Sequence, residues 1–310
     1  MEYVFLAGSC VCFSLQFIFS KLFQRRTDGT VHAAMWSNLL SGISIFIIFF
    51  CINGFRLSVS GGAAALAVLY AVSSIVCTCA SLIGMTSTTV AAITLYTLLG
   101  GVVLPFFYGV ALLSERPSVF RWIGVSLMIL AAFAPYVLNN LHSKKETAKA
   151  SGRFKAAVCC AVVFLTNGLI SIATNASERI PDKVGSNNFL LLSTLLRIVG
   201  AAVILGVFAA RRKSGRFLPK DPVTGSSVTT KAFVILFVIS FFYAVLNGAG
   251  NKLSLKCAET MDASLQFPII SAACIVFSAL IGLFAFKERP GKGDVAGIVL
   301  AVAGIVFSIF

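Results

Sequence analysis

The sequence has little charge and few side chains that titrate near neutral pH. Charged residues occupy 12% of its 310 positions, 11 of them are acidic, and the chain has two histidines. Hydrophobic residues make up 58%, and the mean hydropathy is +0.95. Soluble domains carry about 25% charged residues. The composition therefore excludes a soluble globular domain and indicates an integral membrane protein surrounded by lipid.

Motifs for catalysis and metal binding are also missing from the sequence. There is no phosphate-binding loop ending in Gly-Lys-Ser/Thr, no Gly-x-Ser-x-Gly, no His-Glu-x-x-His, and no acidic pair within an apolar segment. The nine cysteines lie within or at the ends of apolar segments, without the second ligand pair or the histidines of a zinc site. We therefore expect no enzyme, no metal and no other cofactor.

Long apolar segments dominate the chain. A membrane crossing needs about 20 apolar residues, which predicts ten membrane-spanning helices. The first segment lacks a basic leader and runs into Lys21, so we expect it to stay in the mature protein. The predicted spans cover residues 2–24, 33–53, 62–84, 87–113, 118–140, 154–177, 187–210, 232–254, 262–286 and 294–310.

Two stretches of the sequence repeat one another 173 residues apart, since residues 70–127 align without a gap onto 243–300. Each repeat holds five predicted spans, and an odd number of spans forces the second copy to insert upside down. The sequence therefore predicts an all-α membrane protein of two inverted five-helix repeats. The predicted repeats are residues 1–141 and 154–310, joined by a basic linker at 142–153.

The net charge of +14 arises from Lys and Arg residues in the short connections between spans, so no nucleic-acid partner is expected. The odd-numbered connections hold 17 of these residues and the even-numbered ones hold 7. The positive-inside rule then places the odd connections in the cytoplasm and both termini outside.

Polar side chains form matched stripes on the third and eighth predicted spans. Each stripe begins with a tyrosine and follows one helix face at i, i+4, i+8 and i+11. Such a face avoids lipid, so it lines a shared cavity or bonds neighbouring helices, and the matching favours the cavity. The stripes are Tyr70, Ser74, Thr78 and Ser81, and Tyr243, Asn247, Asn251 and Ser254.

Arg197 lies near the middle of the seventh predicted span, between Leu196 and Ile198. A cation at that depth faces protein or water and is a candidate functional residue. The alternative is a structural arginine that binds helix ends or backbone carbonyls. Its fixed charge and forked donors suit a carboxylate or a phosphate. It keeps its proton, so it is not a proton carrier.

The remaining candidates come from four other spans. Gln16 and Asn167 lie in the polar centres of the first and sixth spans. Gln266 lies beside Pro268, which is expected to kink the ninth helix and expose carbonyls. Tyr96 lies on the fourth span, whose length of about 26 residues predicts a tilt or bend and a binding element.

Two Glu-Arg-Pro turns, opened by Glu115 and Glu288, occupy matching places in the repeats. We expect each carboxylate to cap the helix that follows it. The last helix carries a stripe of small residues suited to close packing. This stripe is Gly293, Gly297, Ala301 and Gly304.

The segment Phe286-Lys-Glu-Arg-Pro, followed by Gly297 and a last helix of small residues, resembles the end of EamA-type members of the drug/metabolite transporter (DMT) superfamily. Leu113-Ser-Glu-Arg-Pro with Gly124 fits the same pattern in the first repeat. Gln266-Phe-Pro is similar to the family's proline-bearing ninth helix. Arg197 resembles an arginine found early in the second helix of a half, where the first half has Ser41.

The resemblance implies a ten-helix basket in a bacterial plasma membrane. Its central cavity would be lined by the first four helices of each half, with the fifth and tenth helices at the periphery. Eukaryotic relatives are usually drawn with cytoplasmic termini, and we keep the opposite orientation because the charges counted belong to this chain. The opening Leu6-Ala-Gly is also similar to small multidrug resistance proteins, whose first helix carries a proton-coupling glutamate. Gln16 stands there, and a neutral amide exchanges no proton.

These observations predict a secondary transporter that moves a small polar metabolite, an amino acid or organic acid, by alternating access. The alternatives are a non-transporting membrane scaffold or receptor and a facilitative exchanger, and a homodimer stays open. The expected partners are a small-molecule substrate and membrane lipid. The predicted cavity residues are Gln16, Tyr70, Tyr96, Asn167, Arg197, Tyr243, Asn247, Asn251 and Gln266.

Overall fold

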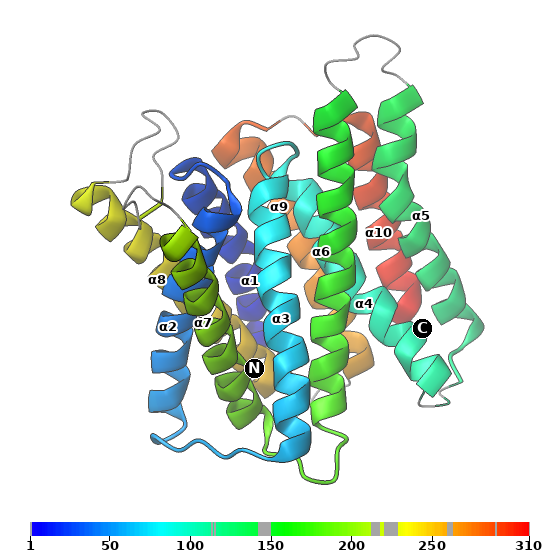
Figure 1. The fold of residues 1–310 in the computed structure, drawn as a ribbon. Coiled ribbons are helices and arrows are strands. Elements are labelled where there is room, and N and C mark those ends of the chain that lie inside the picture. Colours follow the sequence, from blue (N-terminus) through cyan, green and yellow to red (C-terminus); the bar gives the residue numbers. More distant parts are fainter. Residues whose placement is uncertain are drawn as a thin grey trace.

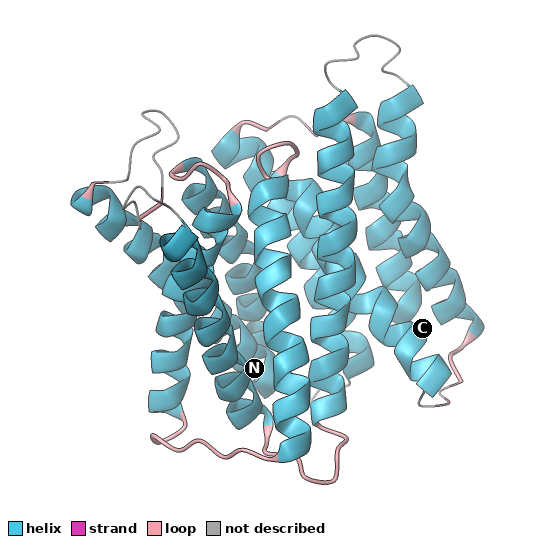
Figure 2. Cartoon of the chain, viewed as in Figure 1, coloured by secondary structure: helices cyan, strands magenta, loops and turns pink. Residues whose placement is uncertain are grey.

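The described part of the chain is entirely α-helical and contains no strand (Figures 1 and 2). The computed structural model describes residues 2–112, 114, 116–141, 150–211, 218–219, 229–258, 263–288 and 290–309. The helices are α1 (Glu2–Arg25), α2 (Val31–Ile52), α3 (Gly61–Gly84), α4 (Val90–Leu112), α5 (Val119–Leu141), α6 (Ala150–Ser177), α7 (Ser186–Arg211), α8 (Thr230–Ala258), α9 (Ala263–Phe286) and α10 (Lys292–Ile309). This order confirms the predicted ten-helix fold class.

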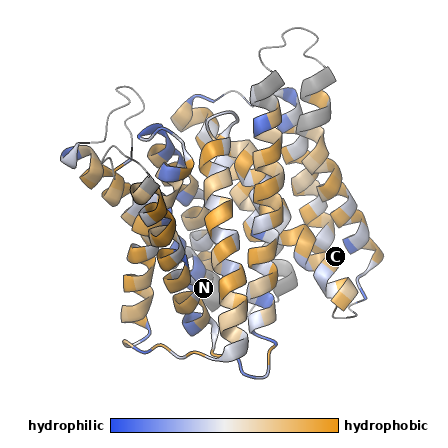
Figure 3. Ribbon diagram, in the orientation of Figure 1, coloured by the Kyte–Doolittle hydropathy of each residue, from blue (hydrophilic) through white to orange (hydrophobic). Residues whose placement is uncertain are grey.

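Length and composition identify the membrane-spanning helices. Within the described residues, nine helices are long and apolar enough to cross a membrane, and α5 adds a shorter apolar run over Val119–Ala134. Large apolar side chains such as Leu112, Phe133 and Phe284 are more than half exposed. Figure 3 shows hydrophobic residues along the outward faces of most helices. Lipid, which solvates such side chains as well as a protein core does, accounts for this surface.

The predicted helix limits agree with the structure to within about two residues, except at the starts of α4 and α6 and at the end of α8. Helix α4 has 23 residues and begins at Val90, three residues later than predicted. Thr89 ends the preceding turn, and its Oγ1 accepts a hydrogen bond from the Ala92 amide at 3.2 Å. The predicted over-long fourth span is therefore wrong, because a threonine cap starts the helix late. α6 begins at Ala150, which lies inside the predicted linker of residues 142–153.

The two repeats interlock and do not lie side by side as separate bundles. α1 packs on α8 and α9, and α6 packs on α3 and α4. α2 contacts α7 and α8, while α7 contacts α2 and α3; α4 meets α9, and α5 meets α10. A two-fold relation between α1–α5 and α6–α10 produces this pairing. In Figure 1 the N-terminus lies toward the lower end of the bundle, whereas α6 begins at the upper end, as inverted repeats require.

Glycines permit the closest helix contacts. A Cβ atom on Gly124 of α5 would lie 2.6 Å from the carbonyl oxygen of Gly304 on α10, and the reverse distance is the same. The four small residues predicted to form a packing stripe on the last helix are all buried, which confirms that prediction. The two backbones touch directly, and this pair lies away from the cavity described below.

A second close approach joins α4 to α6. A Cβ atom on Gly100 would lie 2.0 Å from the carbonyl oxygen of Phe164, which no side chain tolerates. Asn167, one turn further along α6, donates a hydrogen bond from Nδ2 to the Thr97 carbonyl oxygen at 2.7 Å. The glycine crossing therefore brings Asn167 within reach of α4 and fixes which way its amide points.

Candidate functional site

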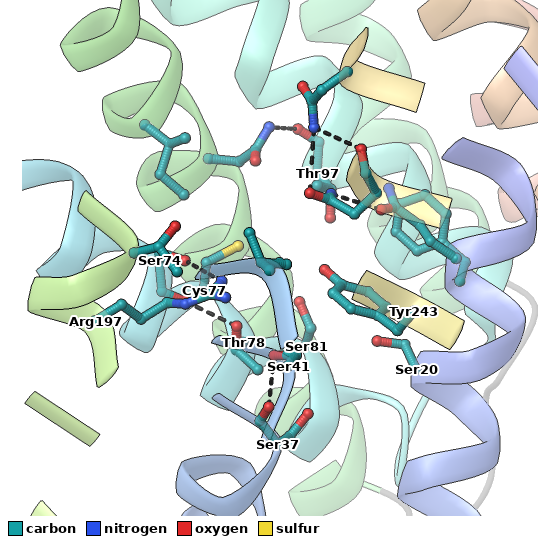
Figure 4. Close-up of a pocket in the computed structure, with 18 of the residues that line it drawn as sticks. Ser20, Ser37, Ser41, Ser74, Cys77, Thr78, Ser81, Thr97, Arg197 and Tyr243 are labelled. Carbon is teal, nitrogen blue, oxygen red and sulfur yellow. Dashed lines mark hydrogen bonds between the residues drawn. The ribbon is translucent and has the colours of Figure 1, made fainter. Parts of the chain in front are cut away.

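A polar cavity of about 200 Å³ lies between the two repeats (Figure 4). Its lining comes from α1, α2, α3, α4, α6, α7 and α8, and none of its described residues belongs to α5 or α10. Figure 4 shows Arg197 beside Ser74 on one side of the cavity, with Tyr243 and Ser20 across from them. The packing of α1 against α8 and of α6 against α3 encloses the space, because each repeat supplies walls on both sides.

Seven of the nine predicted site residues line this one cavity. They are Gln16, Tyr70, Asn167, Arg197, Tyr243, Asn247 and Asn251. Tyr96 is not among the lining residues: its hydroxyl donates a hydrogen bond to the Ala132 carbonyl oxygen of α5, and its ring packs near Met85 and Cys160. We therefore leave Tyr96 out of the proposed site. The side chain of Gln266 lies outside the described residues.

The matched stripes on α3 and α8 face one another across the cavity. All four residues of the α3 stripe line it, as do Tyr243, Asn247 and Asn251 of the α8 stripe. The side chain of Ser254 lies outside the described residues. The two stripes use their polar groups differently. Thr78 on α3 donates to the Ser74 carbonyl oxygen of its own helix at 2.9 Å, whereas Asn247 on α8 binds a residue of α1.

Among the described residues that line the cavity, Arg197 is the one charged side chain. It is 8% exposed. Its Nη1 donates to Ser74 Oγ at 3.4 Å, and Nε and Nη2 are buried without a partner. Buried guanidinium nitrogens normally have acceptors, and an unpaired buried charge costs several kcal/mol. Arg197 therefore has two donors available for an anionic group.

Gly42 on α2 leaves room for that guanidinium. A Cβ atom at Gly42 would lie 3.6 Å from both unpartnered nitrogens and 2.8 Å from Ile198 Cγ1. A larger residue would push α2 away from α7 and crowd the donors. The glycine keeps the approach to Arg197 open on the α2 side.

Hydrogen bonds fix the orientation of an amide chain from α8 to α1. Asn251 Nδ2 donates to the Asn247 carbonyl oxygen at 2.8 Å and to Asn247 Oδ1 at 3.2 Å. A carbonyl oxygen only accepts, so the nitrogen of Asn251 must face it. Asn247 Oδ1 is then an acceptor, and Asn247 Nδ2 donates to Gln16 Oε1 at 2.8 Å. Gln16 is left with its NH₂ donors, and Asn251 is left with its Oδ1 acceptor.

Asn167 is oriented by the same logic. Its Nδ2 donates to the Thr97 carbonyl oxygen, so its Oδ1 is free to accept. The cavity thus has donors at Arg197 and Gln16 and amide acceptors at Asn167 and Asn251. A ligand that carries both an acceptor and a donor group matches this arrangement.

Some residues that line the cavity were not predicted from the sequence. Ser37 and Ser41 line the cavity from α2, and Thr97 lines it from α4. The two serines are spaced i, i+4, and Ser41 Oγ donates to the Ser37 carbonyl oxygen at 2.6 Å. This spacing within an apolar span was a usable signal. For Thr97 the sequence holds no such signal, because the contact with Asn167 is made by the Thr97 backbone carbonyl.

Glu288 does not cap the helix that follows it, so that prediction is wrong. Its Oε2 accepts from the Val90 amide at the start of α4 at 2.8 Å, and its Oε1 lies 3.2 Å from Lys21 Nζ. The interlocked fold brings the start of α4 within hydrogen-bonding distance of this turn. At the start of α10, Asp294 Oδ2 accepts from the Gly291 amide at 2.8 Å instead. Glu115 lies outside the described residues.

The opposite end of the bundle is held by contacts between the α6–α7 and α2–α3 connections. Asp182 Oδ2 accepts from the Gly62 amide in the first turn of α3 at 3.0 Å. This hydrogen bond, with a further one from Ser60, lowers the pKa of the exposed Asp182 carboxyl. Asn188 Oδ1 accepts from Asn53 Nδ2 at 2.9 Å and from the Ser58 amide at 3.1 Å.

Comparison with known proteins agrees with this architecture. Residues 1–136 match the EamA-like transporter family, which belongs to the DMT superfamily. The match covers most of the predicted first repeat. A solved crystal structure is similar at 13% sequence identity over 97% of both chains, with a TM-score of 0.53. That likeness shows a shared fold alone. The apolar helices identify a multi-pass integral membrane protein, and the family match over the first repeat is consistent with a transporter.

Proposed function

We propose that this EamA-like protein is a secondary transporter that moves a small polar metabolite with a carboxylate by alternating access through the central cavity. Its substrate is an amino acid or an organic acid, and its location is the plasma membrane of a bacterium. The observation that carries this proposal is Arg197, a buried cation with two unpartnered donors in a polar cavity between inverted repeats. A substrate carboxylate would pair with it.

The amide groups favour an amino acid over an organic acid. A carboxylate uses donors, which Arg197 and Gln16 supply. A protonated amine needs acceptors, and Asn167 and Asn251 each retain an amide oxygen. The rings of Tyr70 and Tyr243 also line the cavity and offer faces to a cation. A dicarboxylate would meet these acceptors with a second negative group and lose affinity.

The test is uptake of labelled compounds into proteoliposomes, with thermal stability of the purified protein as a second measurement. The panel pairs each amino acid with its deaminated analogue and its decarboxylated amine, such as alanine, propionate and ethylamine homologues of increasing size. We expect amino acids to be taken up and to raise the melting temperature. Arg197→Gln should abolish both effects, and Lys231→Gln, which removes an exposed charge at the start of α8, should change neither.

Three results would count against the proposal. Uptake and stabilisation that are indifferent to Arg197→Gln would remove this cavity as the substrate site. Preference for the deaminated analogues would replace the amino acid with an organic acid. An absence of uptake and of stabilisation across the whole panel, with Cys77 closed to water-soluble thiol reagents from both faces, would support a scaffold or receptor.

A further inference from the structure

An ionic cluster joins the two repeats on the face that carries the odd-numbered connections. Lys21 near the end of α1 lies 3.2 Å from Glu288, which belongs to the α9–α10 connection. Their side chains are only 8% and 13% exposed. Lys21 Nζ also donates to the Met85 carbonyl oxygen at 2.8 Å, while Glu288 accepts from the Val90 amide. Every charge-bearing atom in the pair therefore has a partner.

This cluster lies at one end of the cavity. Met85, whose carbonyl oxygen binds Lys21, lines the cavity, and so does Ser20, the neighbour of Lys21 on α1. Glu288 joins this end of α1 to the start of α4 and comes from the other repeat. The ion pair therefore lies directly beside two residues of the cavity lining.

On the opposite face, Glu115, the counterpart of Glu288, lies outside the described residues. α6, which corresponds to α1 in the second repeat, has no basic residue in its last turn. The carboxylate that crosses between repeats there, Asp182, is exposed and binds backbone amide groups of α3. The described contacts between the repeats therefore differ at the two ends, with a shielded ion pair at one end and an exposed carboxylate on backbone amides at the other.

We propose that Lys21 and Glu288 form the gate of the cavity on the face of the odd-numbered connections, and that the cavity opens to that face when this pair separates. The inference rests on the proposed function, since a gate presumes a cavity that opens to both faces. The pair is shielded from water and weakly screened by salt. Removing one partner leaves a shielded charge that gains hydration when the gate opens, so single neutralisation favours the open state.

The test measures the rate at which a membrane-impermeant thiol reagent modifies Cys77, a cavity residue that is 9% exposed. Peptide mass spectrometry reads Cys77 alone, so the other cysteines stay in place. The variants are Glu288→Gln, which keeps an acceptor for the Val90 amide, and Lys21→Met, which keeps the apolar stem. The control is Lys155→Met, since Lys155 makes an exposed contact with Thr86 on the same face at 3.3 Å.

We expect modification from the odd-connection face to become at least about fivefold faster in both gate variants, with no change in Lys155→Met. Modification from the other face should stay the same or slow down. Unchanged rates in the two folded gate variants overturn the proposal, as does an equal rise from both faces, which indicates general loosening. If Lys21→Met fails to fold, the rate of Cys77 modification in Glu288→Gln alone tests the proposal. These rates require no substrate, so a failed uptake experiment and a failed gate remain separate results.

Discussion

The two repeats share a fold but contribute different chemistry to the cavity. The first repeat supplies mainly hydroxyl groups, from Ser37, Ser41 and the α3 stripe. The second supplies the cation Arg197 and the amide groups of Asn167, Asn247 and Asn251. Gln16 is the one amide that the first repeat contributes. Duplication produces the enclosure, and divergence of one copy produces the ligand-binding groups.

The two repeats also contribute different groups to the contacts at the ends of the bundle. Glu288 and Asp182, both from the second repeat, bind backbone amides at the starts of α4 and α3 in the first. A helix start carries unpaired N–H groups and a partial positive charge, so a carboxylate stabilises it. The first repeat thus presents helix starts and the second presents the anions that bind them.

The largest expected effect comes from removing the charge that distinguishes the repeats. Arg197→Gln should weaken binding of a carboxylate substrate by at least about 30-fold, since losing one partner of a buried charge pair costs about 2–5 kcal/mol. Titration of substrate against thermal stability measures this change. A change in substrate affinity of less than about threefold would mean that Arg197 has a structural role. The charge on the second repeat would then not distinguish how the two repeats bind substrate.

Breaking the amide chain should have an intermediate effect. Asn247→Ala leaves Gln16 Oε1 without its donor and removes one of the two acceptors of Asn251 Nδ2, and an unsatisfied buried group costs about 1–3 kcal/mol. We expect uptake to fall about tenfold, with the loss greater for amino acids than for their deaminated analogues. Asn175→Ala, an exposed asparagine at the end of α6, is the matched control and should be neutral.

Removing a hydroxyl from the α3 stripe should have little effect. Thr78 satisfies its hydroxyl on its own helix, so Thr78→Val removes no contact between helices. Uptake should change by less than about threefold, and Ser74→Ala, which loses the contact with Arg197, should fall between Thr78→Val and Asn247→Ala. A tenfold loss in Thr78→Val would contradict the division between repeats and place the first repeat's hydroxyls on the substrate.

The smallest effect concerns the exposed Asp182. The carboxylate is held in its charged form by the Gly62 amide, and its pKa lies below the ordinary value of 3.8. Its stabilisation is present at neutral pH and is lost as pH falls below about 4. Asp182→Asn should lower the melting temperature by about 2 °C or less at pH 7. The difference from the unmodified protein should shrink at pH 3, and a difference that grows with acid would contradict this account.

Much of the architecture was predictable from local sequence. Apolar runs of membrane length gave the ten helices, because each run must satisfy its backbone groups internally in lipid. The 173-residue offset connected Tyr70 with Tyr243 and predicted two matched faces, which the structure brings to one cavity. The apolar runs and the repeat offset are properties of single helices or of equivalent positions in the two copies. They can therefore be read without knowing which helices pack together.

The predictions that were wrong concern contacts that depend on how the two repeats interlock. Tyr96 was expected in the cavity, but its hydroxyl meets a carbonyl of α5. Glu288 was expected on the next helix, and it meets α4, which is distant in sequence. The bond between Asn247 and Gln16 joins residues 231 positions apart. Periodicity identifies the polar face of a helix, but the helix opposite that face is set by tertiary packing.

The partners of α1 bear on how the chain assembles during synthesis. This helix packs mainly on α8 and α9, which follow it in the chain by about 200 residues. Until those helices are made, the Gln16 amide has no Asn247 to bind, so the growing chain holds an unsatisfied polar group in lipid. We therefore expect α1 to reach its final contacts only after the second repeat has been synthesised.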